Sequence, residues 1–188
     1  MNDYSHLKVY PSFEDAKAAY FKALDRHYEE VQKGFEEFGR EFCDALNADY
    51  DRLAELVKIH DKSKYEVEVE VEGFLADHFP YENDEIGDSY GLRRAKYEKA
   101  LLSHFQNNPH HPEHWIEINY ETYTFEAKPM EPVYVCEMAL DWIGYKQSFG
   151  VKSISKYWEF TRVTKYLHED TIRMAEKLLA IIKEHGKD

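Results

Sequence analysis

The sequence predicts an all-α protein that folds as a single domain over residues 1–188, and three observations support this. The chain of 188 residues is long enough to bury a substantial core and short enough for one domain. Hydrophobic residues make up 43% of it and aromatic residues 15%, which is typical of globular proteins. Most apolar residues recur with the 3.6-residue period of amphipathic helices.

The composition also excludes several classes of function. A formal net charge of −13 argues against a surface for duplex nucleic acid, because neutralising phosphates requires a surplus of Lys and Arg. A small anionic substrate is not excluded, since a bound metal would supply local positive charge. No run approaches the ~18 apolar residues of a membrane span, so we expect no membrane partner.

The cysteines and the N-terminus indicate a compartment. Cys43 and Cys136 lie far apart in the sequence and neither belongs to a CxxC motif, so a disulfide framework is not expected and a reducing environment is the default. The first ten residues lack the basic start and apolar core of a signal peptide. We therefore expect a cytoplasmic protein, whose oligomeric state the sequence does not indicate.

The first predicted helix begins at Ser12, a capping residue that is followed by two acidic residues. Its apolar residues keep a helical period over more than thirty positions. Gly34 and Gly39 could bend or break it. We therefore expect one long or interrupted helix that ends near Ala45.

A second helix is predicted after Asn47 and Asp49, which suit the capping position, and His60-Asp61 falls on its last turn. Residues 66–72 then alternate glutamate and valine, which is typical of a strand. Their apolar residues also fit a helical stripe with those that follow, and a lone strand would have few partners. We therefore favour a helix from about 65 to 79, with the glutamates on a solvated face.

Turn-forming residues predict a loop from Pro80 to Gly91. A further helix is expected to open at Ser89 or Tyr90 and to stop before Asn107. The segment 110–115 should be compact and irregular, because Pro109 before it and Pro112 within it restrict the backbone.

The last third of the chain combines one alternating segment with three helices. Residues 116–130 alternate polar and apolar side chains, so we expect a short β-hairpin or an extended loop. A helix follows directly, and Gly144 and Gly150 should bracket its end. Two more amphipathic helices are predicted at roughly 153–165 and 169–185.

The candidate site starts from the pair His60-Asp61. A histidine beside an aspartate offers an imidazole nitrogen and a carboxylate oxygen, which suit a divalent metal such as Zn, Mn, Fe or Co. One such pair can arise by chance, so other ligands have to converge on it. Four predicted helical segments offer them in the order His27, His60-Asp61, His104 and Asp141, and His110-His111 lies between the last two.

Three motifs then carry a resemblance to known proteins. They read His60-Asp61-x-Ser63-Lys64-Tyr65, Asn108-Pro109-His110-His111-Pro112-x-x-Trp115 and Glu137-Met138-x-x-Asp141-Trp142. The ordered histidines and aspartates resemble the HD-domain superfamily of metal-dependent phosphohydrolases. The motifs HDxSK, NPHHPxxW and EMxxDW are similar to those of an uncharacterised bacterial and phage family, over roughly residues 20–180.

The resemblance implies an HD-like helical bundle that holds one or two divalent ions, with Mn, Fe, Zn, Co and Mg as candidates. The ligands of members with one ion are matched by His27, His60, Asp61 and Asp141. The additional histidines of members with two ions are matched by His104 and by one of His110 and His111, a choice that stays open. HD-domain relatives are mainly phosphohydrolases of nucleotides or cyclic nucleotides, and a minority bind two irons and oxidise carbon substrates with O2.

Two further residues are candidates for catalytic roles. Lys64 lies at i+4 from His60, where it could hold a phosphate, although a solvated helix-end cation is the alternative. Glu137 lies four residues before Asp141, so both carboxylates face one way, and it could accept a hydrogen bond from a ligand or act as a general base. The pair Arg93-Arg94 is expected to form surface salt bridges.

We therefore expect a hydrolase that acts on phosphoester bonds of a small phosphorylated molecule, such as a nucleotide or deoxynucleotide. A divalent ion lowers the pKa of a bound water toward ~7 and polarises a phosphoryl oxygen. Two alternatives stay open. One is a di-iron oxygenase on the same scaffold, and the other is a non-catalytic module in which a metal staples the helices and the protein binds a nucleotide or a partner.

Overall fold

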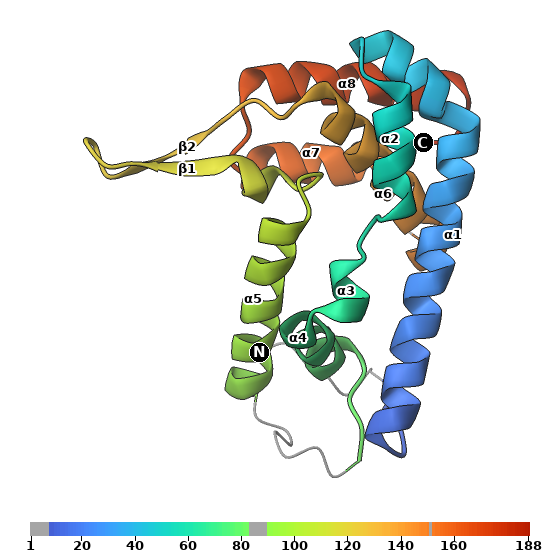
Figure 1. Ribbon diagram of the computed structural model, residues 1–188, viewed down its shortest axis with the longest axis vertical. Helices are drawn as coiled ribbons and strands as arrows, with labels where there is room; N and C mark the ends of the chain where they lie inside the picture. Colours follow the sequence, from blue (N-terminus) through green and yellow to red (C-terminus); the bar gives the residue numbers. More distant parts are fainter. Residues whose placement is uncertain (1–7, 83–89, 151) are drawn as a thin grey trace. The chain divides into compact units, whose positions relative to one another are not determined.

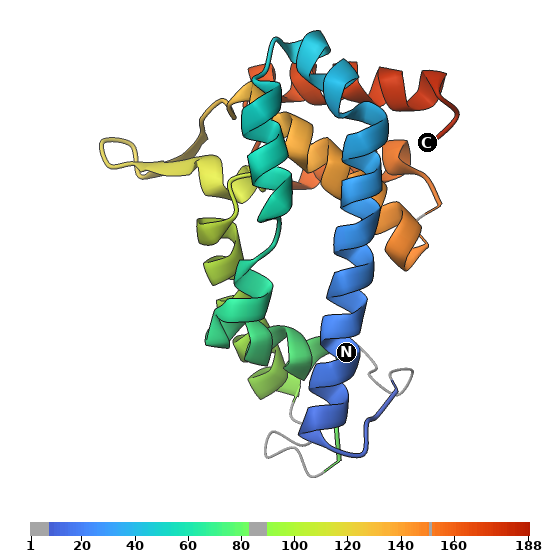
Figure 2. The ribbon, with the colours of Figure 1, turned by 45° about the vertical axis from the view of Figure 1, so that its right-hand side comes forward.

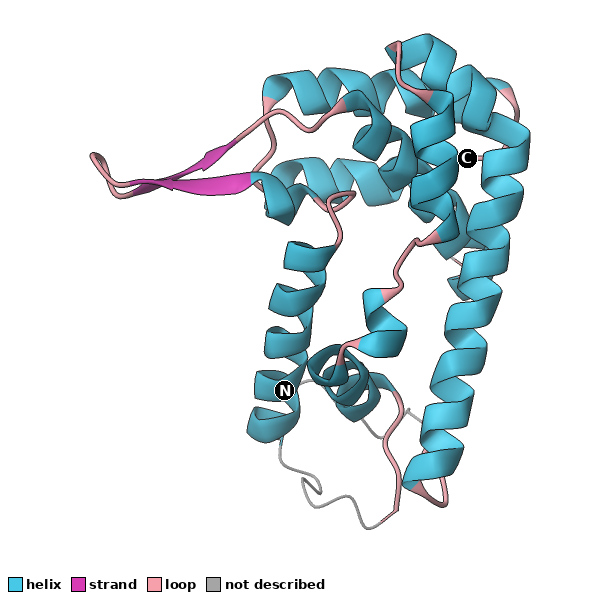
Figure 3. Ribbon diagram, viewed as in Figure 1, coloured by secondary structure: helices cyan, strands magenta, loops and turns pink. Residues whose placement is uncertain are grey.

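The computed structural model describes residues 8–82, 90–150 and 152–188. Helices account for most of these residues, and the only sheet among them is a two-stranded hairpin (Figure 3). The prediction of an all-α fold with a short hairpin is confirmed. No helix of the described residues is long and apolar enough to cross a membrane.

Figure 1 labels the elements. The helices are α1 (Phe13–Leu46), α2 (Tyr50–Lys58), α3 (Ser63–Glu66), α4 (Glu68–His78), α5 (Tyr90–Asn107), α6 (Pro132–Phe149), α7 (Ile154–Thr164) and α8 (Glu169–Glu184), and a 3-10 helix, η2, spans Pro112–Trp115. Strands β1 (Ile116–Asn119) and β2 (Thr124–Ala127) pair antiparallel.

The chain divides into two compact units. Unit 1 consists of Met1–Asp25 and Asp61–Asn107, and unit 2 of Arg26–His60 and Asn108–Asp188. In unit 1, α4 packs against α5, and α3 contacts both. In unit 2, α6 contacts α2, α7 and α8. A single domain over residues 1–188 stays a prediction.

Helix α6 is the centre of unit 2. It is buried on several sides rather than along one stripe, as Val135, Met138 and Leu140 show, which is typical of a helix surrounded by others. Phe38 from α1 and Leu178 from α8 belong to the same core. The acidic residues of α6 therefore lie in or beside an apolar interior.

The core of unit 1 joins the first turns of α1 to α4 and α5. It includes Tyr20, Phe74 and Ala100. A Cβ atom on Gly73 would lie 2.4 Å from the Cβ of Ala100 and 2.6 Å from the carbonyl oxygen of Lys96. Glycine thus permits the close approach of α4 to α5, and this approach turns one face of α4 inward.

The first helix is uninterrupted. α1 runs through Gly34 and Gly39 without a break (Figure 2) and ends at Leu46, one residue beyond the predicted end. A Cβ atom on Gly34 would lie 3.4 Å from Ile143 of α6, so this glycine lies at a helix contact. Asp49 caps α2 as predicted, because its side chain accepts a hydrogen bond of 3.0 Å from the backbone N–H of Arg52.

The placement of His60-Asp61 on the last turn of a helix is wrong. α2 ends at Lys58, and α3 begins only at Ser63. Asp61 has a φ of 56°, in the left-handed region, so the backbone cannot continue as a helix between the two. The helix expected from 65 to 79 is confirmed as α4, which an extended residue, Val67, separates from α3.

The end of α6 also differs from the prediction. Gly144 lies inside the helix, and Gly150 alone ends it, with a φ of 70°. The hairpin and the two C-terminal helices are confirmed. Of the loop predicted over residues 80–91, positions 83–89 lie outside the described residues, and α5 starts at Tyr90.

Candidate metal centre

Three of the predicted ligands meet in unit 2. Oδ1 of Asp141 lies 2.9 Å from Nε2 of His27 and 3.5 Å from Nε2 of His60. Two atoms that bind one ion at ~2.1 Å lie roughly 3.0 Å apart at a right angle and roughly 3.4 Å apart at a tetrahedral angle. The three side chains, supplied by α1, the turn after α2, and α6, therefore have the spacing of ligands that share an ion.

Gly144 permits this approach, and sequence reasoning missed it. It follows Asp141 by one turn of α6. A Cβ atom on Gly144 would lie 2.5 Å from Cγ2 of Val31 and 3.2 Å from Cε1 of His27. Any side chain here would therefore push α1 away from α6 and His27 away from Asp141. Its position in the middle of a helix, where glycine is unfavourable, was the available signal.

Glu137 contacts two of the histidines of unit 2, His60 and His110. Its Oε1 is 3.0 Å from Nδ1 of His60 and 3.3 Å from Nδ1 of His110. Burial alone would raise the pKa of Glu137, but the two imidazoles outweigh it and hold that pKa at about 2. The ionised carboxylate only accepts hydrogen bonds, so both Nδ1 atoms donate to it.

This contact orients His60. With Nδ1 turned to Glu137, its Nε2 is the atom beside Asp141, which is the arrangement in which a carboxylate holds a metal-binding histidine. Burial would raise the pKa of Asp141, but its contacts with His27 and His60 hold that pKa well below its usual range. One ligand atom from each of His60, His110 and Glu137 also lies within 4.8 Å of the others.

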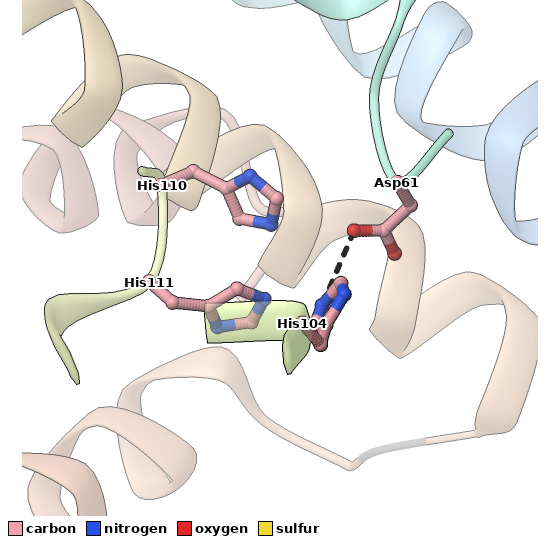
Figure 4. A group of neighbouring side chains, drawn as sticks. All are labelled: Asp61, His104, His110 and His111. Carbon is pink, nitrogen blue, oxygen red and sulfur yellow. Dashed lines mark ion pairs between the residues drawn. The ribbon is translucent and has the colours of Figure 1, made fainter. Parts of the chain in front are cut away.

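The neighbouring histidines differ in their surroundings. His110 is buried, with 1% exposure, and contacts Glu137, whereas His111 is partly exposed. Their rings lie 4.3 Å apart (Figure 4). The indole N–H of Trp115 donates to the carbonyl oxygen of Pro109 over 2.7 Å, which holds the segment in a compact form. Of the two, the geometry of unit 2 favours His110 as a site residue, because it is buried and contacts Glu137.

In unit 1, Asp61 pairs with two predicted site residues. Its Oδ1 lies 3.4 Å from Nε2 of His104 (Figure 4), and its Oδ2 accepts a hydrogen bond of 2.6 Å from Nζ of Lys64. Asp61 adopts the left-handed conformation noted above, and backbone conformations of this kind concentrate at functional sites. The side chain of Lys64 therefore reaches Asp61 across this turn. The expected helical spacing of i+4 from His60 does not apply, because the chain is not helical between α2 and α3.

Glu70 is the functional candidate that sequence reasoning missed. The prediction of a solvated face is wrong for this residue, which is completely buried. Its carboxylate is surrounded by four groups, which are Ser63 Oγ at 2.7 Å, Ser103 Oγ at 2.9 Å, Asn107 Nδ2 at 3.2 Å and His104 Nδ1 at 3.2 Å. Burial would raise the pKa of Glu70, but hydrogen bonds from His104 and the serines lower it. Glu70 thus holds His104 as Glu137 holds His60.

No local signal could have identified Glu70. Its glutamate neighbours Glu68 and Glu72 fit the same pattern and are exposed.

The prediction of surface salt bridges for the two arginines is half right. Arg94 pairs with Glu98 at 2.8 Å, whereas Arg93 is buried and donates to the carbonyl oxygen of Ala76 at the end of α4.

The seven predicted ligands are divided between the units. His27, His60, His110, His111 and Asp141 belong to unit 2, and Asp61 and His104 to unit 1. The boundary passes through the peptide bond between His60 and Asp61. Buried clusters of His, Asp and Glu that could hold a metal are thus present. A centre of one or two ions that combines ligands of both units, with one of His110 and His111, stays a prediction.

One family model matches the chain. It is described as a family of unknown function, DUF5662, and the match covers residues 16–184. No curated protein and no solved structure was found to match. The match agrees with the expectation of an uncharacterised family, and it assigns neither an HD domain nor an activity.

Proposed function

We propose that this chain, which belongs to the DUF5662 family of unknown function, is a metal-dependent phosphohydrolase that acts on a small phosphorylated substrate such as a nucleotide or deoxynucleotide. One observation carries the proposal. In unit 2, Asp141 lies at ligand spacing from the Nε2 atoms of His27 and His60. Imidazole and carboxylate ligands of this kind suit Zn, Mn, Fe or Co.

The ligands come from both the geometry and the sequence. His27, His60 and Asp141 are supported by their distances in unit 2. Asp61, the next residue in the chain after His60, is taken as the fourth ligand on the sequence motif alone. His104 and one of His110 and His111 are taken on the same ground as ligands of a second ion.

The residues around these ligands have separate tasks. A divalent ion, when bound, supplies a Lewis acid and a water molecule of lowered pKa. Glu137 keeps the proton of His60 on Nδ1, so that Nε2 offers a lone pair. Its pKa of about 2 means that it is ionised at neutral pH and a weak base, which favours its role as a hydrogen-bond acceptor over that of a general base.

Lys64 is the cation proposed to meet an anionic substrate. Its side chain is 20% exposed, and its ammonium group already lies against Asp61. In a chain of net charge −13, an anion needs local positive charge to approach. Lys64 would supply it beside a ligand and stabilise the charge that develops on the leaving oxygen when water attacks phosphorus.

The test begins with the metal. Protein purified without chelator is analysed for its elements, stripped, reloaded with Mn, Co, Zn or Fe, and assayed for phosphate release from phosphomonoesters, nucleoside triphosphates and cyclic nucleotides. We expect one or two ions per chain and metal-dependent release. His60→Ala should abolish both, whereas His78→Ala, which alters a half-exposed histidine of α4, should change neither.

Four results would contradict the proposal. Metal-free protein, or metal-loaded protein inactive on the whole panel, would count against a phosphohydrolase. Two irons per chain with O2 uptake would favour the di-iron oxygenase. Tight nucleotide binding without turnover in metal-loaded protein would favour the binding module.

A further inference from the structure

Unit 2 exposes a concentration of large apolar side chains. They lie in two short segments, residues 118–125 and 160–166. Their exposed fractions are 47% for Ile118, 76% for Tyr120, 83% for Tyr123, 58% for Phe125, 65% for Phe160, 75% for Val163 and 58% for Tyr166. We call these seven residues the aromatic patch.

The patch joins the hairpin to α7. Ile118 and Phe125 are paired across β1 and β2, so they share one face of the hairpin. The rings of Phe125 and Tyr166 lie 6.0 Å apart, which connects this face to the turn after α7. Phe160 and Val163 are spaced i, i+3 on α7 and share its exposed side.

The hairpin is amphipathic. Beyond the contact of Phe125 with Tyr166 it projects away from α7 and α8 of its own unit (Figure 1). The opposite face carries the pair Glu117 and Glu126, which Lys128 bridges at 3.4 Å to each. A two-stranded hairpin is at best marginally stable alone, and both of its edges offer unpaired backbone groups. An apolar face on such an element is therefore expected to be covered.

The size of the patch matches a protein interface. A large aromatic side chain has ~200 Å² of surface, so the five aromatic residues alone leave roughly 700 Å² exposed. Ile118 and Val163 add to this. The largest apolar patch of a typical monomer is ~300–600 Å², whereas a standard interface takes ~800 Å² from each partner.

We propose that the aromatic patch binds a second copy of this chain, so that the protein is a homodimer joined through its hairpins and α7 helices. An antiparallel edge is complementary to its own copy, since a two-fold axis places the same strand beside itself. The charges argue against an anionic membrane or nucleic acid. Residues 118–125 contain no basic residue, and Arg162 and Lys165 are each paired with a glutamate.

The test measures the mass of the full chain by light scattering and sedimentation equilibrium over a range of concentrations. Dimers are expected at micromolar protein, because interfaces of this size have dissociation constants of about 1 μM or lower. Phe125→Ser and Phe160→Ser should each weaken the dimer at least ~10-fold, in line with the loss of an aromatic anchor. Leu102→Ser is the matched control, since Leu102 is 59% exposed on α5, outside the patch, and should leave the dimer intact.

A second variant guards against misfolding. Val163→Arg places a charge on the exposed side of α7, should keep the circular dichroism of the wild type, and should still yield a monomer. A wild type that stays monomeric at ~100 μM would overturn the proposal, as would a dimer that all three patch variants leave unchanged. Sedimentation with phosphatidylserine vesicles that Phe125→Ser abolishes would also overturn it, because the patch would then bind lipid.

Discussion

Replacing Glu70 by glutamine tests the buried carboxylate of unit 1. Four donors surround this side chain, two on each oxygen, namely Ser103 and Asn107 on Oε1 and Ser63 and His104 on Oε2. A glutamine keeps the size of the side chain but replaces one oxygen with an NH2 group. Whichever way the amide turns, this group faces two of the four donors.

The magnitude follows from the charge of the acceptor. A hydrogen bond to a charged group contributes ~1.5–3 kcal/mol and a neutral one ~0.5–1.5 kcal/mol. The two bonds that keep an oxygen acceptor therefore each weaken by about 1 kcal/mol, and the two donors that face the NH2 group lose their acceptor. The neutral amide is easier to bury than a carboxylate, which offsets part of this loss. We therefore expect Glu70→Gln to lower the free energy of unfolding by ~2–4 kcal/mol.

Urea denaturation followed by circular dichroism measures this difference. Glu72→Gln is the matched control on the same helix, because Glu72 is exposed and has one ion pair, with Lys96 at 3.3 Å. It should cost less than ~0.5 kcal/mol. A loss for Glu70→Gln as small as that of the control would refute the reasoning.

Nitrogen NMR of His104 gives a second, independent result. An ionised Glu70 cannot donate, so Nδ1 of His104 must carry a proton in the wild type. In Glu70→Gln we expect the proton to move to Nε2 when the amide nitrogen turns to the imidazole. A wild-type His104 without a proton on Nδ1 would refute the role assigned to Glu70.

Three further predictions test other parts of the structure. Gly144→Ala should cost ~1–3 kcal/mol of stability and weaken metal binding, since its Cβ would lie 2.5 Å from a side-chain atom of Val31. The control Gly91→Ala has open space around its Cβ and should be neutral or stabilising. Denaturation and calorimetric metal titration of both variants measure these effects. Glu137→Gln should weaken metal affinity by ~10–100-fold in the same titration, and an unchanged affinity would show that Glu137 does not orient a ligand. Asp188 accepts a hydrogen bond of 2.6 Å from the N–H of Ser155. Burial would raise the pKa of Asp188, but its contacts with Ser155 and Ser153 lower it. The contribution of Asp188 to the stability of the fold is therefore present above the unfolded pKa of ~4 and is lost as the pH falls through the lower folded pKa. Asp188→Ala should therefore cost about 1 kcal/mol near neutral pH and progressively less below pH ~4 in parallel denaturation curves.

Local patterns predicted the helices well, and they failed where backbone conformation or packing overrode periodicity. Over residues 66–72 the helical stripe prevailed over the strict alternation of glutamate and valine, because a lone strand would have few partners. Gly144 looked like a helix end in the sequence, but it lies inside α6, where the absence of a side chain permits the close approach of α1. Asp61 interrupts the chain with a left-handed φ that a non-glycine residue seldom adopts.

The candidate site shows the same division. Sequence order alone suggested His27, His60 and Asp141, and unit 2 brings them to ligand spacing. The buried role of Glu70 was invisible, because its donors come from α3 and α5 and are 7 to 37 residues away in the sequence.

The amino-acid sequence by itself determined the helical class and the caps, since each depends on neighbours within a few residues. It supplied the ligand candidates through their order along the chain, and it left a hairpin or an extended loop open for residues 116–130. Only the tertiary structure decided which carboxylate faces which imidazole and which glutamate is buried. These depend on contacts between segments far apart in the chain, where the removal of water from a charged group makes its hydrogen-bond partners obligatory. Glu70 and Glu137 are the clearest examples, because both are charged, both are buried and both hold a histidine in place through contacts that the sequence does not reveal.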